Sequence, residues 1–240
     1  MVLYRIKQAG RLLQLRSLFL TKNVHTATTE SGLPNLAKLT DRALLRIKGR
    51  DAAKLLQGIT TNDINLLVEG TDKIQYTMFL NSQGRVEYDA FLYVVPGETA
   101  EYLIECDAAV SDDVMSHIKK YKLRSKVEIS DASKEMETWA LFSRSGKLDG
   151  SMVEKTGIIA EKDTRTNALG IRMVIPWNQS PVDLLGIKDC LKVDSVVYKE
   201  HRYTLGIAEG IQEIPPGNPL PLEYNLALIN GGMLHSQIRL

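Results

Sequence analysis

Cysteine is scarce in this sequence. The sequence also lacks long hydrophobic runs, and its cysteines are not spaced as metal ligands. Its 240 residues include two cysteines, Cys106 and Cys190, and neither belongs to a Cys-x-x-Cys or Cys/His pattern. This argues against a disulfide framework and against a metal site, and we expect two buried thiols in a reducing compartment. The apolar run at 91–95 is far shorter than the about 20 residues that cross a bilayer, so we expect no membrane span.

Acidic residues are missing from the first 29 positions, although basic residues recur there. Apolar side chains also recur at helical spacing, as at Leu12, Leu15 and Phe19. A basic, acid-free and amphipathic N-terminal segment is typical of a mitochondrial transit peptide. We therefore assign residues 1–30 to such a leader, with a surface helix of the folded domain as the alternative.

No strong excess of charge of one sign remains after this segment. The other residues carry 25 basic and 29 acidic side chains, and the formal net charge of the whole chain is +1. This near-balance argues against a nucleic-acid-binding surface spread over the protein, so we expect no nucleic-acid partner.

The order of apolar and turn residues predicts alternating strands and helices. The clearest unit is a β-hairpin, with strands at 74–80 and 85–95 around a turn at 81–84. The polar stretch 144–167 is interpreted as an exposed loop, and the prolines within 214–219 argue against regular structure there. Further strands are expected at 43–47, 102–106, 126–129, 138–142 and 171–175, and helices at 52–57, 111–121 and 193–205. This order indicates an α+β domain.

The second hairpin strand is predicted to have two distinct faces. Val86, Tyr88 and Leu92 share one face by the two-residue period of a strand. Asp89 and Phe91 share the other.

Three clusters of residues resemble one known family. They are LLQGITTNDI at 55–64, YTMFLNSQGRVEYD at 76–89, and HRYTLGIAEG at 201–210, which leads to PLPLE at 219–223. Their order and spacing are similar to the folate-binding domain shared by the glycine-cleavage T-protein, dimethylglycine-type enzymes and iron–sulfur assembly factors of the YgfZ type. The resemblance implies an aminomethyltransferase-like α+β fold, with antiparallel sheets and packed helices, over residues 31–231.

Within that family, the leader and the third cluster point to the mitochondrial assembly factors. The resemblance then implies a role in making [4Fe–4S] clusters in the mitochondrial matrix, alongside A-type iron–sulfur scaffold proteins. It also implies tetrahydrofolate as a possible ligand.

A pterin ring needs an apolar slot, a few fixed polar groups and a cation near its anionic tail. The resemblance suggests that Tyr76, Leu80 and Tyr88 form the slot, and that Asn81 supplies an orienting amide. For the charged positions it suggests Asp89 as the acid near the reactive nitrogen and Arg202 as the cation. The alternatives are core tyrosines, a solvated carboxylate at Asp89 and a structural ion pair at Arg202.

The sequence departs from the T-protein at two acids. Two adjacent acids of the T-protein correspond here to Tyr88 and Asp89, so one acid is kept. The Arg-x-Glu of the third cluster reads Arg202-Tyr203-Thr204, so the acid that grips the pterin is lost. This favours a non-enzymatic assembly factor, and we assign no catalytic residue and no metal ligand. A folate-dependent aminomethyl- or methyltransferase and an inactive truncated isoform stay open as alternatives.

The end of the chain also departs from the mitochondrial factors. The resemblance implies that the segment 222–231 should lead into a Lys-Gly-Cys motif and a C-terminal β-barrel domain. We therefore interpret residues 232–240 as a divergent tail, and we expect this chain to lack the barrel domain and the motif cysteine. We expect a domain that loses a packed neighbour to be marginally stable or to aggregate.

Overall fold

A computed structural model describes residues 32–70, 72–97, 100–145, 148, 158–186 and 189–224. The predicted leader, 1–30, and the predicted tail, 232–240, lie outside the described residues. Within the described part, no helix combines the length and the apolar character that crossing a bilayer requires.

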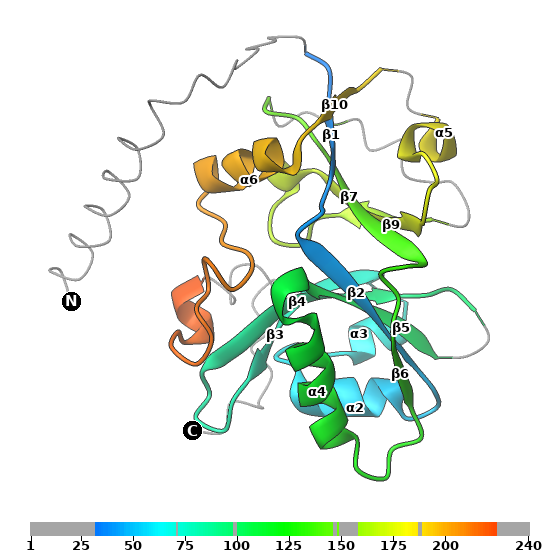
Figure 1. The fold of residues 1–240 in the computed structure, drawn as a ribbon, viewed down its shortest axis with the longest axis vertical. Coiled ribbons are helices and arrows are strands. Elements are labelled where there is room, and N and C mark those ends of the chain that lie inside the picture. The colour runs from blue at the N-terminus through cyan, green and yellow to red at the C-terminus, as the bar shows by residue number, and fades with distance from the viewer. Residues whose placement is uncertain are drawn as a thin grey trace, which may run out of the picture. The chain divides into compact units, whose positions relative to one another are not determined.

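Five antiparallel strands form what we call the hairpin sheet, in the order β3-β4-β5-β2-β6 (Figure 1). The predicted hairpin forms its edge. Its turn is held by Asn81, whose side-chain oxygen accepts hydrogen bonds from the backbone N–H groups of Gln83 at 2.9 Å and Arg85 at 3.0 Å. The strands are β2 (Arg42–Lys48), β3 (Ile74–Leu80), β4 (Val86–Val94), β5 (Glu101–Asp107) and β6 (Glu128–Asp131).

Helices α2 (Ala52–Ile59) and α4 (Ser111–Lys122) cover one face of the hairpin sheet, as Figure 1 shows. Leu55 of α2 and Ile118 of α4 belong to apolar stripes at helical spacing, which are buried against β2, β4 and β5. Acidic residues occupy the first turn of α4 and lysines its last turn, as the helix dipole favours. A single-turn helix, α3 (Asn65–Val68), packs beside them.

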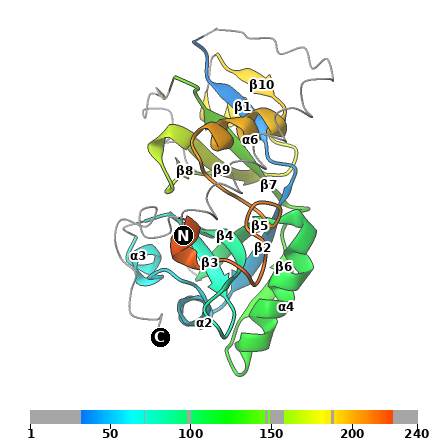
Figure 2. The same cartoon turned by 90° about the vertical axis from the view of Figure 1, so that its left-hand side faces the viewer.

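The remaining strands form what we call the mixed sheet, in the order β10-β1-β7-β9-β8. The β1–β10 pair is parallel and the other pairs are antiparallel. Leu185 of α5 is buried on one face of this sheet and Tyr198 of α6 on the other, with its ring centroid 5.2 Å from that of Phe142. Figure 2 shows α6 beside β1. The elements are β1 (Asn35–Lys38), β7 (Met136–Phe142), β8 (Ile159–Lys162), β9 (Ile171–Pro176), α5 (Pro181–Leu185), β10 (Leu191–Val193) and α6 (Ser195–Thr204); short 3-10 turns lie at η1 (Ala108–Val110), η3 (Asn167–Leu169) and η4 (Pro221–Tyr224).

The second face of the hairpin sheet is turned toward the mixed sheet. Phe91 and Tyr93 of β4 share one buried core with Ile159 of β8 and Val174 of β9. Because side chains alternate along β4, its even-numbered residues from position 88 onward meet α2 and α4, whereas its odd-numbered ones point between the sheets. Asp89 therefore lies between the two sheets.

Most predicted elements are confirmed, and the α+β class with them. The loop predicted at 144–167 is wrong in part, because Ile159–Lys162 forms β8 and pairs with β9. The helix predicted from residue 193 begins at Ser195, because Leu191–Val193 pairs with β1 and Asp194 caps the helix, accepting a hydrogen bond from the Val196 N–H at 2.9 Å.

Two further predictions need correction. Val86 lies on the face of Phe91 rather than that of Leu92, because the pairing of β3 with β4 shifts at this end: Phe79 pairs with Tyr88 and Leu80 with Val86. The thiol of Cys106 is buried as expected, and burial raises its pKa to about 12, whereas Cys190 is only half-buried.

Candidate functional site

A network of buried charged side chains lies between the two sheets. It draws on β2, β4 and β5 from the hairpin sheet, on β9 from the mixed sheet, and on the segments that precede β9 and follow α6. Its members are Arg42, Asp89, Glu105, Asp163, Arg165, Arg172 and Glu209, with the hydroxyls of Tyr76, Tyr93 and Tyr198.

Arg172 of β9 connects the sheets. Its guanidinium donates to the carboxylate of Glu105 on β5, from Nε at 2.9 Å and also from Nη2. From Nη1 it donates to Glu209 at 3.0 Å and to the Tyr198 hydroxyl at 3.2 Å. The guanidinium carbon lies 4.2 Å from the ring centroid of Phe91, so the cation is stacked as well as paired.

Glu209 is the acid that meets the most cations. Its carboxylate lies 2.6 Å from Arg165, 3.0 Å from Arg172 and 3.9 Å from Arg42. Burial alone would raise the pKa of Glu209, but Arg172, Arg165 and Arg42 outweigh it and hold this pKa well below its usual range. Glu209 is therefore an anion at neutral pH, and it binds three cations in the interior.

Asp89 is less well compensated. Its carboxylate accepts hydrogen bonds from the Gly210 N–H at 3.0 Å and the Tyr76 hydroxyl at 3.4 Å, and its nearest cation, Arg42, is 3.9 Å away. Burial raises the pKa of Asp89, and Arg42 offsets this only in part. The side chain is 2% exposed, which excludes a solvated carboxylate at this position.

Arg202 forms a structural ion pair. From α6 its two terminal nitrogens donate to Glu213 at 2.8 and 3.0 Å, and one of them also donates to the Ile207 carbonyl at 2.8 Å. These bonds fold the segment after α6 back onto the helix. The same segment carries Glu209 and Gly210 into the network.

The other predicted ligand positions lie apart from the network. Tyr88 lies on the opposite face of the hairpin sheet, with its ring centroid 6.0 Å from that of His117 on α4. Leu80 packs at the edge of the core between the sheets, and Asn81 holds the hairpin turn. Of the six predicted positions, Tyr76 and Asp89 are joined by a hydrogen bond.

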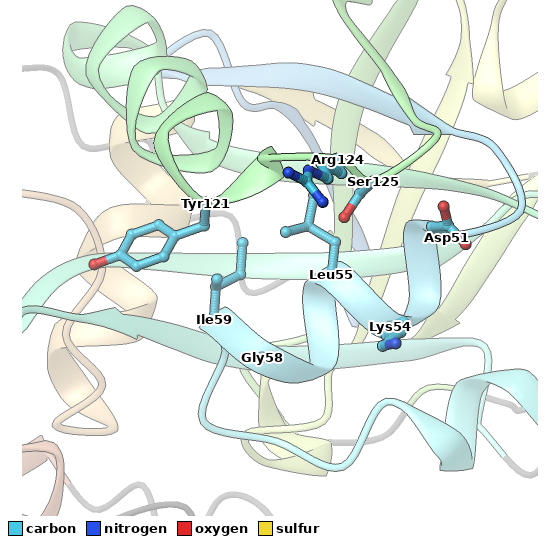
Figure 3. Close-up of a pocket in the computed structure, with 8 residues that line it drawn as sticks. All are labelled: Asp51, Lys54, Leu55, Gly58, Ile59, Tyr121, Arg124 and Ser125. Atoms are coloured by element: carbon cyan, nitrogen blue, oxygen red, sulfur yellow. The ribbon is translucent and has the colours of Figure 1, made fainter.

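A surface hollow of about 420 Å³ lies elsewhere, between α2 and the end of α4 (Figure 3). Leu55 and Ile59 of α2 face Tyr121 and Arg124 across it. It contains none of the six predicted ligand positions.

Residues 19–143 match the family model described as the GCVT N-terminal domain, which is more than half of the chain. The chain belongs to the GCVT N-terminal domain family.

Three relatives of this chain that are similar in sequence carry the same protein name. The chain is 33% identical to the "iron-sulfur cluster assembly factor IBA57, mitochondrial" of Homo sapiens, over 91% of this chain and 65% of that protein. It is 36% identical to the protein of the same name from Mus musculus, over 81% of this chain and 56% of that protein. A homolog in Dictyostelium discoideum is 29% identical, over 82% and 55% of the two chains. The chain therefore spans less than two thirds of each of these relatives.

A solved structure confirms the predicted aminomethyltransferase-like fold. The glycine cleavage system aminomethyltransferase T from Bartonella henselae superposes with a TM-score of 0.64, covering 82% of this chain and 58% of that one. The identity is 15%, so this likeness concerns the fold alone.

The described GCVT domain does not assemble the predicted tetrahydrofolate positions into one site. Tyr76 and Asp89 are closed in between the sheets, and Tyr88 lies behind the same sheet. A pterin that contacts all of them would have to pass through the strands. Folate binding stays a prediction.

Most members of the network are not among the residues predicted from the sequence. The sequence nevertheless contains a sign of them, in charged residues that stand inside apolar strands. Glu105 and Arg172 each stand alone inside an otherwise apolar strand, in Tyr-Leu-Ile-Glu-Cys and Ile-Arg-Met-Val-Ile. A charged residue in a buried strand needs a partner, so such positions deserve to be paired with one another.

Proposed function

We propose that this chain acts in mitochondrial iron–sulfur cluster assembly, as a factor for [4Fe–4S] clusters in the matrix. The observation that carries the proposal is its likeness, over most of its length, to relatives named as mitochondrial iron–sulfur cluster assembly factors. The basic segment at 1–29, which contains no acidic residue, supports import into mitochondria.

A non-enzymatic role fits the chemistry of the interior. The carboxylates and guanidinium groups between the sheets are bonded to one another, which leaves little capacity for moving a substrate proton. Thr204 stands where the resemblance places the pterin-binding acid, and its hydroxyl donates to the His201 carbonyl within α6 at 2.7 Å. We therefore propose that the chain works through contacts with A-type scaffold proteins.

The first test is rescue in cells whose own IBA57-type gene has been deleted. The whole chain should restore the activity of mitochondrial enzymes that carry [4Fe–4S] clusters and leave [2Fe–2S] enzymes unchanged. The chain without residues 1–30 is the matched control and should fail through lack of import. Absence of rescue by chain that is present in the matrix would refute the assembly role.

The partner is tested separately, by calorimetric titration of a purified A-type scaffold protein into the purified chain. Saturable binding supports the proposed contact. Rescue without such binding would leave the assembly role in place and remove A-type proteins as its direct partner.

A folate-dependent transferase is the second candidate, favoured by the acid kept at Asp89 and by the aminomethyltransferase fold. Titration of tetrahydrofolate, followed through Trp139 and Trp177 fluorescence, tests it. Binding that is lost in Asp89→Ala and retained in an exposed-surface control, Lys192→Glu, supports a pterin site. No binding to folded protein removes both the ligand and the transferase.

A further inference from the structure

The end of α4 and the facing side of α2 form a strongly basic surface, which we call the basic corner. Its cations are Lys54, Lys119, Lys120, Lys122, Arg124 and Lys126. Within the described part of the chain none of them makes an ion pair. On other surfaces Lys38, Lys48, Lys73 and Lys199 are all paired with glutamates. The basic corner is therefore an unneutralised surface on a domain that has more acidic than basic residues after its leader.

The hollow of Figure 3 lies inside this corner. Its floor is apolar, formed by Leu55 and Ile59, and the exposed ring of Tyr121 stands at one side. Lys54 and Arg124 lie on its rim, from α2 and from the segment after α4. A volume of about 420 Å³ is enough to enclose a large side chain, with cations left over for the groups beside it.

An outward-pointing leucine stands next to the hollow. The Ser125 N–H donates to the Lys122 carbonyl at 2.7 Å, which closes a turn at 122–125. Leu123 takes φ +43° and ψ −111° there, close to the first central position of a type II′ turn, which glycine dominates. Its side chain is 88% exposed, so burial of this side chain within the described fold does not offset the free-energy cost of the backbone conformation. A leucine held this way is suited to contact with another molecule.

We propose that the basic corner is a docking surface for an acidic segment of a partner protein. An apolar side chain of that segment would enter the hollow, its carboxylates would meet Lys54 and Arg124, and Leu123 would pack against its flank. Charge complementarity identifies the occupant, because Lys54 and Arg124 stand on the rim of one apolar depression without an ion pair in the described part of the chain, and four more lysines lie on or directly after α4. The proposal does not depend on which reaction or assembly the partner serves.

Two other polyanions fit the surface less well. A bilayer surface is smooth and cannot fill a concave hollow, although it could take up Leu123. Nucleic acid would need aromatic rings to stack on its bases, and Tyr121 is the one aromatic residue that lines the hollow.

The test is selection from a random-peptide display library on the immobilised 240-residue chain. Enriched peptides should carry Asp or Glu on both sides of one aromatic or large aliphatic residue. Calorimetry on the synthesised peptides should show that Lys54→Glu combined with Arg124→Glu weakens binding at least about tenfold. The matched control, Lys162→Glu with Lys192→Glu, reverses two exposed cations on the mixed sheet and should leave the affinity unchanged.

A second variant separates binding from folding. Leu123→Gly relieves the backbone and should weaken peptide binding several-fold without lowering the midpoint of unfolding. If peptide affinity falls only in variants whose midpoint of unfolding is lowered, and not with substitutions in the basic corner as such, the proposal is contradicted.

The remaining outcomes overturn it. A selection without acidic peptides, or with peptides that bind the doubly reversed variant equally well, removes the docking surface. Phosphatidylcholine vesicles with and without cardiolipin, and a single-stranded oligonucleotide, are tested beside the peptides. Binding of either one through Lys54, Arg124 and Leu123, with no acidic peptide selected, would assign the corner to a membrane or to nucleic acid instead.

Discussion

Glu209 and Asp89 are both buried carboxylates in one network, but folding moves their pKa values in opposite directions. Burial favours the neutral acid in both cases. Around Glu209 three arginines within 4 Å outweigh burial, whereas Asp89 has one arginine at 3.9 Å and two neutral donors. The difference lies in the number of cations that each carboxylate meets. The two residues should respond differently to the same isosteric change.

Replacement of each acid by its amide measures this difference. Glu209→Gln leaves three buried arginines without their shared anion and should lower the free energy of unfolding by about 3–5 kcal/mol. Asp89→Asn keeps an acceptor for the Gly210 N–H and should change the free energy of unfolding by less than about 1 kcal/mol in either direction, because burial already disfavours the charged form of this side chain. Urea unfolding at neutral pH checks both values. Equal losses of unfolding free energy in the two variants would contradict the idea that the number of neighbouring arginines sets the contribution of each carboxylate.

Acid should destabilise the protein through the carboxylates whose pKa values are lowered on folding. These are Glu105, Glu209 and Glu213, for which neighbouring arginines outweigh burial. Their stabilisation is fully present above the unfolded pKa of about 4.3, and is lost as the pH falls below it toward the folded values. The raised pKa of Asp89 acts with the opposite sign, because its protonation on acidification relieves a buried charge.

The sign for Asp89 leads to a testable difference. Asp89→Asn removes the opposing contribution, so its free energy of unfolding should fall more steeply than that of the parent as the pH drops below neutral. Urea titrations at a series of pH values between about 6 and about 3 measure both slopes. A shallower slope in the variant would mean that Asp89 is stabilised as an anion.

At the scale of elements, the turn that follows α4 is the most strained local structure described. Leu123 occupies a conformation that side chains with a Cβ rarely adopt, and its exposed side chain recovers nothing by burial. Leu123→Gly should therefore raise the free energy of unfolding by about 1 kcal/mol. Leu123→Ala retains a Cβ and should leave the stability within about 0.5 kcal/mol of the parent. Thermal unfolding of the two variants checks this, and equal stability of the two would argue against strain.

The hairpin strands are the easiest elements to predict, because they are long. β3 and β4 are β-rich runs of 7 and 9 residues on either side of a turn that contains glycine. β8 has four residues, two of them buried, inside a polar stretch, so the sequence there predicts a loop. Its strand character comes from pairing with β9, a tertiary effect.

The site was less predictable than the fold, because its partners are distant in sequence. Glu105 and Arg172 are 67 positions apart, and Glu209 lies 37 positions beyond Arg172. Each is visible as an isolated charge, but no local pattern pairs them. The residues that carry the family resemblance are easier to recognise in the sequence, because they form the contiguous clusters at 55–64, 76–89 and 201–210. Contiguity did not bring them to one site: Tyr88 and Asp89 are adjacent in sequence and lie on opposite faces of β4.

At the scale of the whole described domain, different helices pack on the two sheets, and the network is what the two sheets share besides one apolar core. α2 and α4 cover the hairpin sheet, whereas α5 and α6 pack on the mixed sheet. Apolar contact is not directional. It sets the distance between two packed sheets, but it does not specify how far one sheet is shifted along the other. Directional bonds from Arg172 to Glu105 specify which residues must meet.

This connection predicts that the two sheets unfold together. Trp139 reports on the mixed sheet through β7, and hydrogen exchange of the β4 and β5 amides reports on the hairpin sheet. In the parent chain both signals should be lost at the same urea concentration. Marginal stability also stays a prediction: the common transition should lie at low urea, and a cooperative thermal transition at an ordinary temperature in a monodisperse sample would contradict it.

Arg172→Met should separate the two transitions. The variant keeps an apolar stem but removes the cation that Glu105 and Glu209 share, so two buried carboxylates lose a partner and about 3–5 kcal/mol is expected to be lost. The mixed sheet should then unfold at lower urea than the hairpin sheet, whose β2–β5 and β4–β5 ladders do not involve residue 172. Leu36→Ala is the control, because it opens a cavity in the core beneath α5, which contains no member of the network, and both signals should shift together. Coincident transitions in Arg172→Met would mean that the apolar core alone couples the sheets, and that the buried charges serve another purpose.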